Sequence, residues 1–108
     1  MEIAVRIPHG KWTVVEMTGR VDAHSAEMAE KALLACLEKG EPYLAVGLAA
    51  VSFMSSAGLR SLLMALKAAQ KRNGKVALLR PQATVLEVLE MCGFTGLFSV
   101  VQDLGELV

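Results

Sequence analysis

The chain has 108 residues, of which 54% are hydrophobic and only 5% are aromatic, so a single core of aliphatic side chains is expected rather than disorder. Eleven basic residues balance eleven acidic ones, which leaves no net charge to attract nucleic acid or an anionic membrane. The chain opens without a cationic and apolar leader, and no apolar run approaches the roughly 20 residues that cross a bilayer. These features predict a cytoplasmic protein without nucleic-acid binding or membrane insertion.

The first predicted elements form a β-hairpin. Apolar residues alternate with small or polar ones through residues 3–7, and residues 12–18 are rich in β-forming side chains. A Pro-His-Gly sequence at residues 8–10 separates the two runs. Gly19 is expected to end the second strand.

A helix and a buried strand follow the hairpin. Residues 25–39 carry apolar side chains on one stripe at helical spacing, and Gly40 supplies a left-handed stop. Residues 43–48 are mostly apolar on both faces. Such a run is typical of a central strand in a sheet that helices cover.

The second half of the chain alternates helix and strand. A helix capped by Ser55 or Ser56 is predicted to end at the Asn-Gly pair of residues 73–74. The later elements are a strand at 76–79, a helix at 81–92 and a short apolar segment at 97–101. Two opening strands followed by this alternation predict an α/β sandwich, with a mixed sheet and covering helices.

Side chains that could support metal or redox chemistry are few. His9 and His24 have no Cys, His or carboxylate at the spacing of a metal site, so no metal is expected. Cys36 and Cys92 lie far apart in the sequence and within apolar helical patterns. This placement predicts buried, reduced thiols rather than a disulfide.

Catalytic motifs are also missing from the sequence. Neither of the two glycine-rich phosphate loops occurs, so no nucleotide cofactor is expected. Asp22, His24 and Ser56 could supply an acid, a base and a nucleophile, but the first two are nearly adjacent and no G-x-S-x-G elbow surrounds the serine. The chain is therefore predicted not to be an enzyme.

Residues 51–60 place two hydroxyl groups where a strand turns into a helix. A phosphate on Ser55 or Ser56 would meet unpaired backbone N–H groups and the positive end of the helix dipole. Both serines also fit a purely structural role as helix caps. The residue types alone leave these two readings open.

The sequence Phe53-Met54-Ser55-Ser56-Ala57-Gly58-Leu59-Arg60 resembles the signature of the STAS domain in bacterial anti-sigma factor antagonists. In that signature an aromatic-apolar pair precedes Asp or Ser, the phosphorylatable Ser, a small residue, Gly and Leu. Residues 19–23, 73–75 and 88–98 are similar to further family segments. The resemblance implies one STAS domain over residues 1–108, an α/β fold with a mixed sheet of four to five strands and helices packed on one face.

Carried over by position, the resemblance implies that Ser56 is the phosphate acceptor. Ser55 stands where many members have Asp, and Gly47 and Ala49 stand where the common pattern has Asp-x-Ser. Gly58 is expected to be small because a partner or the adjoining loop approaches it closely. The residues expected to bind the partner are Asp22, Phe53, Met54, Ser55, Ser56, Ala57 and Gly58.

The implied function is regulation of transcription by binding. The unphosphorylated domain would bind an anti-sigma factor that is itself a serine kinase, and would thereby release a sigma factor. Phosphorylation of Ser56 would switch it off, and a phosphatase would restore it. The alternative is a non-catalytic STAS subunit of a transporter or stress-sensing complex.

Overall fold

A mixed sheet forms the centre of the molecule, and the order of its five strands follows the order along the chain. The computed structural model describes residues 2–5, 9–40 and 42–107. The strands are β1 (Glu2–Val5), β2 (Thr13–Val21), β3 (Tyr43–Met54), β4 (Lys75–Leu79) and β5 (Ser99–Val101). β1 pairs antiparallel with β2, and the remaining neighbours pair in parallel. The predicted mixed sheet is confirmed.

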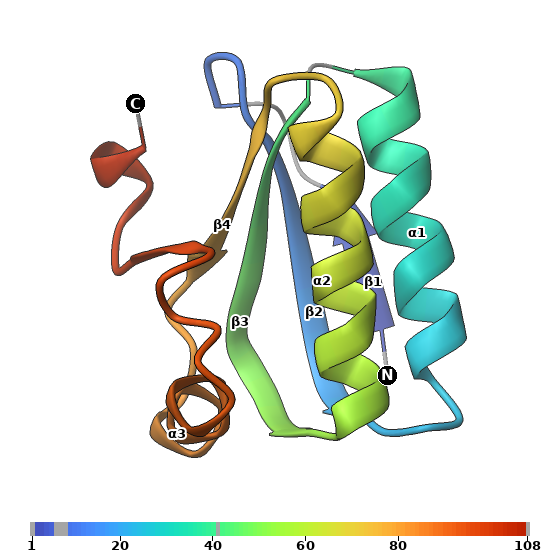
Figure 1. The fold of residues 1–108 in the computed structure, drawn as a ribbon, viewed down its shortest axis with the longest axis vertical. Coiled ribbons are helices and arrows are strands. Elements are labelled where there is room, and N and C mark those ends of the chain that lie inside the picture. Colours follow the sequence, from blue (N-terminus) through green and yellow to red (C-terminus); the bar gives the residue numbers. More distant parts are fainter. Residues whose placement is uncertain (1, 6–8, 41, 108) are drawn as a thin grey trace.

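Three helices connect the parallel strands: α1 (Ala26–Lys39), α2 (Ser56–Gln70) and α3 (Ala83–Met91). Parallel crossovers are right-handed, so helices between strands laid down in one direction cover the same face. Figure 1 shows α1 and α2 side by side along this face of the sheet. Leu33 of α1, Leu62 of α2 and Leu89 of α3 share one core with the sheet. Helices packed on one face, as predicted, are confirmed.

The other face of the sheet is covered in part by the end of the chain. The short 3-10 helix η1 (Leu104–Glu106) and the residue after it bring Leu104 and Leu107 against Trp12 and Val14. The ring of Trp12 also meets Tyr43 edge to face, with centroids 5.5 Å apart. This second apolar cluster covers part of the sheet face that the three helices leave free.

β2 and β3 are both longer than the sequence predicts. Gly19 does not end β2: with a φ of 105° it accommodates an irregularity, and the strand continues to Val21. β3 extends to Met54 because Val51, Phe53 and Met54 pair with residues 19–21 of β2. The two long strands therefore carry Val21 and Met54 together to the edge of the sheet where α2 begins.

The prediction of two buried thiols is wrong. Cys92 is exposed because it follows α3 as its C-cap and leaves the stripe that Val85 and Leu89 bury. Cys36 is half-buried on α1, and this burial raises the pKa of its thiol. Both cysteines are free thiols.

The predicted hairpin is confirmed in the pairing of β1 with β2, while residues 6–8 of that prediction lie outside the described residues.

Gly58, in the first turn of α2, packs against the end of β2. A Cβ atom at this position would lie 2.8 Å from Cγ1 of Val21 and 2.9 Å from Cγ of Met54. Real Cβ atoms do not approach that closely, so the missing side chain lets the helix start sit on the strand exits. The last residues of β2 and β3, rather than a partner or a loop, account for the small residue.

We expect Gly58→Ala to destabilise the fold. Overpacking of this kind costs roughly 1 to 3 kcal/mol, whereas alanine in a helix regains at most about 1 kcal/mol. The measurement is the free energy of unfolding in urea. Gly96→Ala is the matched control, because a Cβ atom there meets nothing within 4 Å. Equal loss in the two variants, or none in either, would contradict the close packing of Gly58.

Candidate functional site

The start of α2 is joined directly to the end of β2. The backbone N–H of Ser55 donates to the carbonyl oxygen of Val21 at 2.8 Å, and the Ser55 hydroxyl donates to the same oxygen at 3.0 Å. The pairing of β2 with β3 is thus carried one residue beyond β3. As a result, the loop after Val21 and the first turn of α2 lie side by side, at the lower end of the sheet in Figure 1.

The two neighbouring serines have different environments. Ser55 is the N-cap of α2, and its hydroxyl accepts from the backbone N–H of Gly58 at 3.2 Å while it donates to Val21. Ser56 is the first residue of the helix, and its side chain is exposed. Within the described part of the chain, no hydrogen bond engages the Ser56 hydroxyl. Only one of the two hydroxyls is therefore needed to hold the helix start.

Asp22 organises the loop between β2 and α1. Its Oδ1 accepts from the backbone N–H groups of His24 and Ser25, each at 3.0 Å, and lies 3.1 Å from the Ser25 hydroxyl. These bonds, led by the one from the Ser25 backbone, hold the pKa of Asp22 below its ordinary value. The carbonyl of Asp22 also accepts from the N–H of Ala26, where α1 begins. The carboxylate thus stays ionised and shapes the loop beside α2.

An aromatic ring and a cation lie together at the same end of the sheet. Phe53 is 39% exposed, and the guanidinium carbon of Arg20 lies 4.4 Å from the centroid of its ring. The two residues face each other in the register of β2 and β3. Sequence reasoning missed Arg20, because the stacking depends on a pairing that follows two register shifts.

Burial divides the residues that were expected to bind a partner. Met54 is buried and so is Gly58, so neither offers its own surface to another protein, and the expected direct contact does not fit these two. Both support the first turn of α2 from beneath. The members of the predicted set that reach the surface are Asp22, Phe53, Ser55, Ser56 and Ala57.

The missing side chain of Gly47 leaves room for the side chain of Glu16. The two residues are partners across β2 and β3, and a Cβ atom at Gly47 would lie 2.6 Å from the carboxyl carbon of Glu16. The glutamate side chain therefore lies over β3, where the common family pattern has an aspartate. A carboxylate is present on this part of the sheet face that the helices leave free, but it comes from the neighbouring strand β2.

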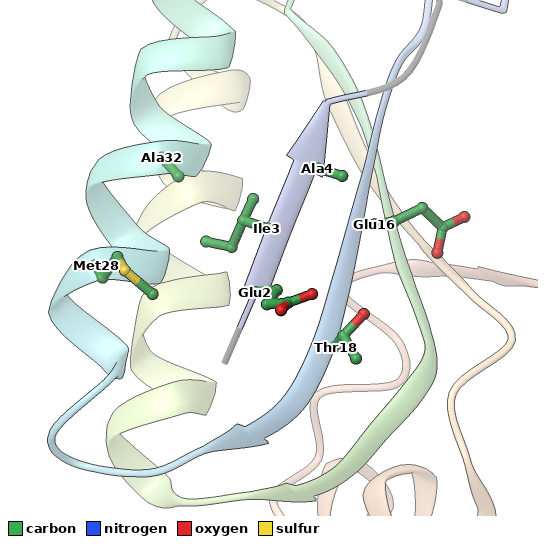
Figure 2. A pocket seen from close by; sticks show the side chains of 7 residues that line it. All are labelled: Glu2, Ile3, Ala4, Glu16, Thr18, Met28 and Ala32. Carbon is green, nitrogen blue, oxygen red and sulfur yellow. The ribbon is translucent and has the colours of Figure 1, made fainter.

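An open groove of about 580 Å³ runs round the free edge of β1. Figure 2 shows Ile3 of β1 on the side of α1, facing Met28 and Ala32, while Glu2, Ala4, Glu16 and Thr18 lie on the other side of the sheet. None of the residues predicted to form the site lines this groove. The hollow is therefore separate from the start of α2.

The described residues, 2–5, 9–40 and 42–107, contain neither a candidate metal site nor a candidate membrane-spanning helix. No group of three or more His, Cys, Asp or Glu side chains in that part of the chain could hold a metal ion. None of its helices has the length and apolar character needed to cross a membrane.

Comparison with known proteins agrees with this geometry. The family model of the STAS domain matches residues 2–107. Over 84 residues the chain is 34% identical to "Putative anti-sigma factor antagonist BtrV" of Bordetella bronchiseptica, which covers 78% of this chain and 72% of that protein.

Solved structures show the same fold at low sequence identity. An anti-sigma factor antagonist from Mycobacterium paratuberculosis has a TM-score of 0.83 and 24% identity, with 97% of this chain and 90% of that chain covered. SpoIIAA in its unphosphorylated form has a TM-score of 0.80 and 19% identity, with 94% and 90% covered. SpoIIAA of Bacillus in its phosphorylated form has a TM-score of 0.72 and 18% identity, with 94% and 93% covered. The family match and the Bordetella relative show that this chain belongs to the STAS domain family, as its sequence from Phe53 to Arg60 predicts.

Proposed function

We propose that this protein is an anti-sigma factor antagonist that is switched by phosphorylation of Ser56. In its unphosphorylated state it binds an anti-sigma factor with serine kinase activity, and a sigma factor is released for transcription. The observation that carries the proposal is the exposed Ser56 hydroxyl beside a Ser55 hydroxyl that is already engaged. The names of the Bordetella relative and of the structural neighbours support the same role.

The hydrogen bonds explain why Ser56 is the better acceptor. Phosphoryl transfer moves the γ-phosphoryl group of ATP, held by the kinase, onto a serine Oγ, while the hydroxyl proton leaves to a base on the kinase. Attack by Ser55 would remove the proton that its hydroxyl donates to Val21 and would alter the cap on Gly58. Attack by Ser56 leaves the cap and the strand pairing in place.

The charge of a phosphate on Ser56 and the exposed ring of Phe53 support the proposal that phosphorylation weakens binding. A phosphoserine carries about −1.5 to −2 charges at pH 7 and three strong acceptor oxygens. Phe53 offers exposed apolar surface at the same end of the molecule. A phosphate buried in a contact with this ring would lose its hydration without gaining an equivalent partner, so the modified protein dissociates. A phosphatase in the cytoplasm then restores the binding form.

The first test maps the modified residue. The kinase is the anti-sigma factor that co-purifies with the tagged protein, and the purified pair is incubated with ATP. We expect a single phosphate, on Ser56, by intact mass and peptide fragmentation. A phosphate on Ser55 alone, or none with an active kinase, would contradict the proposal.

The second test separates charge from loss of the hydroxyl. We expect Ser56→Ala to keep its affinity for the co-purified anti-sigma factor and Ser56→Asp to bind at least about tenfold more weakly in calorimetric titration, because only aspartate adds a charge to be desolvated. Both variants should remain folded, since an acidic side chain in the first turn of a helix is favourable by roughly 0.3 to 1 kcal/mol. Equal affinities would favour the alternative of a STAS subunit with a structural role.

The third test distinguishes the two serines by stability. Ser55→Ala removes a cap and a bond to β2, so we expect a loss of roughly 0.5 to 2 kcal/mol in the free energy of unfolding. Ser56→Ala is the matched control and should stay within about 0.5 kcal/mol of the parent, as exposed substitutions usually do. Urea denaturation of the three proteins measures both values. A larger loss for Ser56→Ala than for Ser55→Ala would reverse the assignment of the cap.

A further inference from the structure

We infer that Arg60 is a positioning residue that holds the phosphate of phosphorylated Ser56 across one turn of α2. The inference rests on the proposed modification of Ser56 and adds the group that receives the new charge. In the modified protein the arginine forms an ion pair within the helix, which keeps the helix start ordered.

The spacing of the two residues places them on one helical face. Arg60 follows Ser56 by four residues, and side chains at this spacing lie roughly 5 to 6 Å apart at Cβ. Both side chains are exposed, whereas Gly58 and Leu59 between them are buried against the sheet. A long guanidinium side chain at Arg60 can therefore reach phosphate oxygens on Ser56 and bind them through two N–H groups.

α1 contains an ion pair at the same spacing of four residues. Glu27, in the first turn of α1, lies 3.2 Å from Nζ of Lys31 four residues later, and both side chains are exposed. α2 has no acidic residue in its first turn, and in the described chain no ion pair engages Arg60. Phosphorylation of Ser56 would supply the anion that α2 lacks at this position.

The other charges at this end of the molecule lie on elements other than α2. The guanidinium of Arg20 is stacked on Phe53, and the carboxylate of Asp22 is bound by its own loop. His24 is exposed on that loop. The next cation along α2 is Lys67, seven residues beyond Arg60 and about 10 Å further along the helix axis.

The test installs phosphoserine at position 56 during translation, so that no kinase is needed. Unfolding in urea is measured with and without the phosphate in the parent, in Arg60→Gln and in Lys67→Gln. We expect the phosphate to favour the folded state at least about threefold more in the parent than in Arg60→Gln. Lys67→Gln, the matched control, should behave as the parent. The difference should largely vanish in 1 M salt, where the Debye length is about 3 Å.

Phosphorus NMR provides a readout that a merely structural role would not change. Arg60 should lower the pKa of the phosphate, so Arg60→Gln should raise this pKa relative to the parent. Arg20, Asp22 and His24 are present in both proteins, and their contributions cancel in the comparison.

An equal effect of the phosphate in the parent and in Arg60→Gln, with an unchanged phosphate pKa, would overturn the inference. That result would leave the proposed switch intact, because it says nothing about which residue a kinase modifies. Conversely, a kinase that ignores Ser56 would refute the proposed function, while the coupling to Arg60 could still be measured in the translated phosphoprotein.

Discussion

The carbonyl oxygen of Val21 is the point on which the candidate site depends. It accepts both the backbone N–H and the hydroxyl of Ser55, so the exits of β2 and β3 are joined at the residue where α2 begins. Gly58 lets the first turn of the helix pack on this junction, with Val21 and Met54 beneath it. Ser55, Gly58, Val21 and Met54 hold the helix start. The Ser56 hydroxyl is therefore not needed to hold it. A residue that is not needed to hold the helix start can be modified without loss of the fold.

The different roles of Ser55, which caps the helix, and Ser56, which is exposed, suit a protein that works by binding. A switch needs two states of similar stability that differ at the surface, since a modification that unfolded the domain would be costly to reverse. A phosphate on Ser56, as proposed, would add charge outside the core, at the same end of the sheet as the exposed ring of Phe53. The hydrogen bonds of the Ser55 cap and of the Asp22 loop do not involve the Ser56 hydroxyl, so the proposed modification would leave them in place. Arg60 would then limit the local electrostatic cost of the modified state without contacting the core.

Much of the fold could be predicted from the sequence because its signals are local. Helical stripes located the starts of α1 and α2 to within about a residue, and the alternation of elements indicated the mixed sheet with helices on one face. The predicted helix ends were less accurate. Gly40 follows α1 in an extended conformation and not as the predicted left-handed stop, and α2 ends at Gln70, before the predicted Asn-Gly pair. Local signals failed where a strand continued through an irregularity. Gly19 reads as a terminator, yet its left-handed φ preserves the pairing of β2 with β3 as far as Val21. The prediction that the Cys92 thiol is buried failed for a similar reason. Cys92 lies one residue past the end of α3, and there its thiol is exposed.

The sequence by itself determined the family, the position of the candidate site at the start of α2 and the presence of two adjacent serines there. Only the tertiary structure decided which serine caps the helix, because that choice depends on the Val21 carbonyl, 34 residues away in the chain. It also moved Met54 and Gly58 beneath the surface, brought Arg20 onto Phe53 and placed Glu16 over Gly47. Each of these contacts joins β2 to β3 or to the helix after it. Their register is set by packing between distant segments, which periodicity along one segment cannot express.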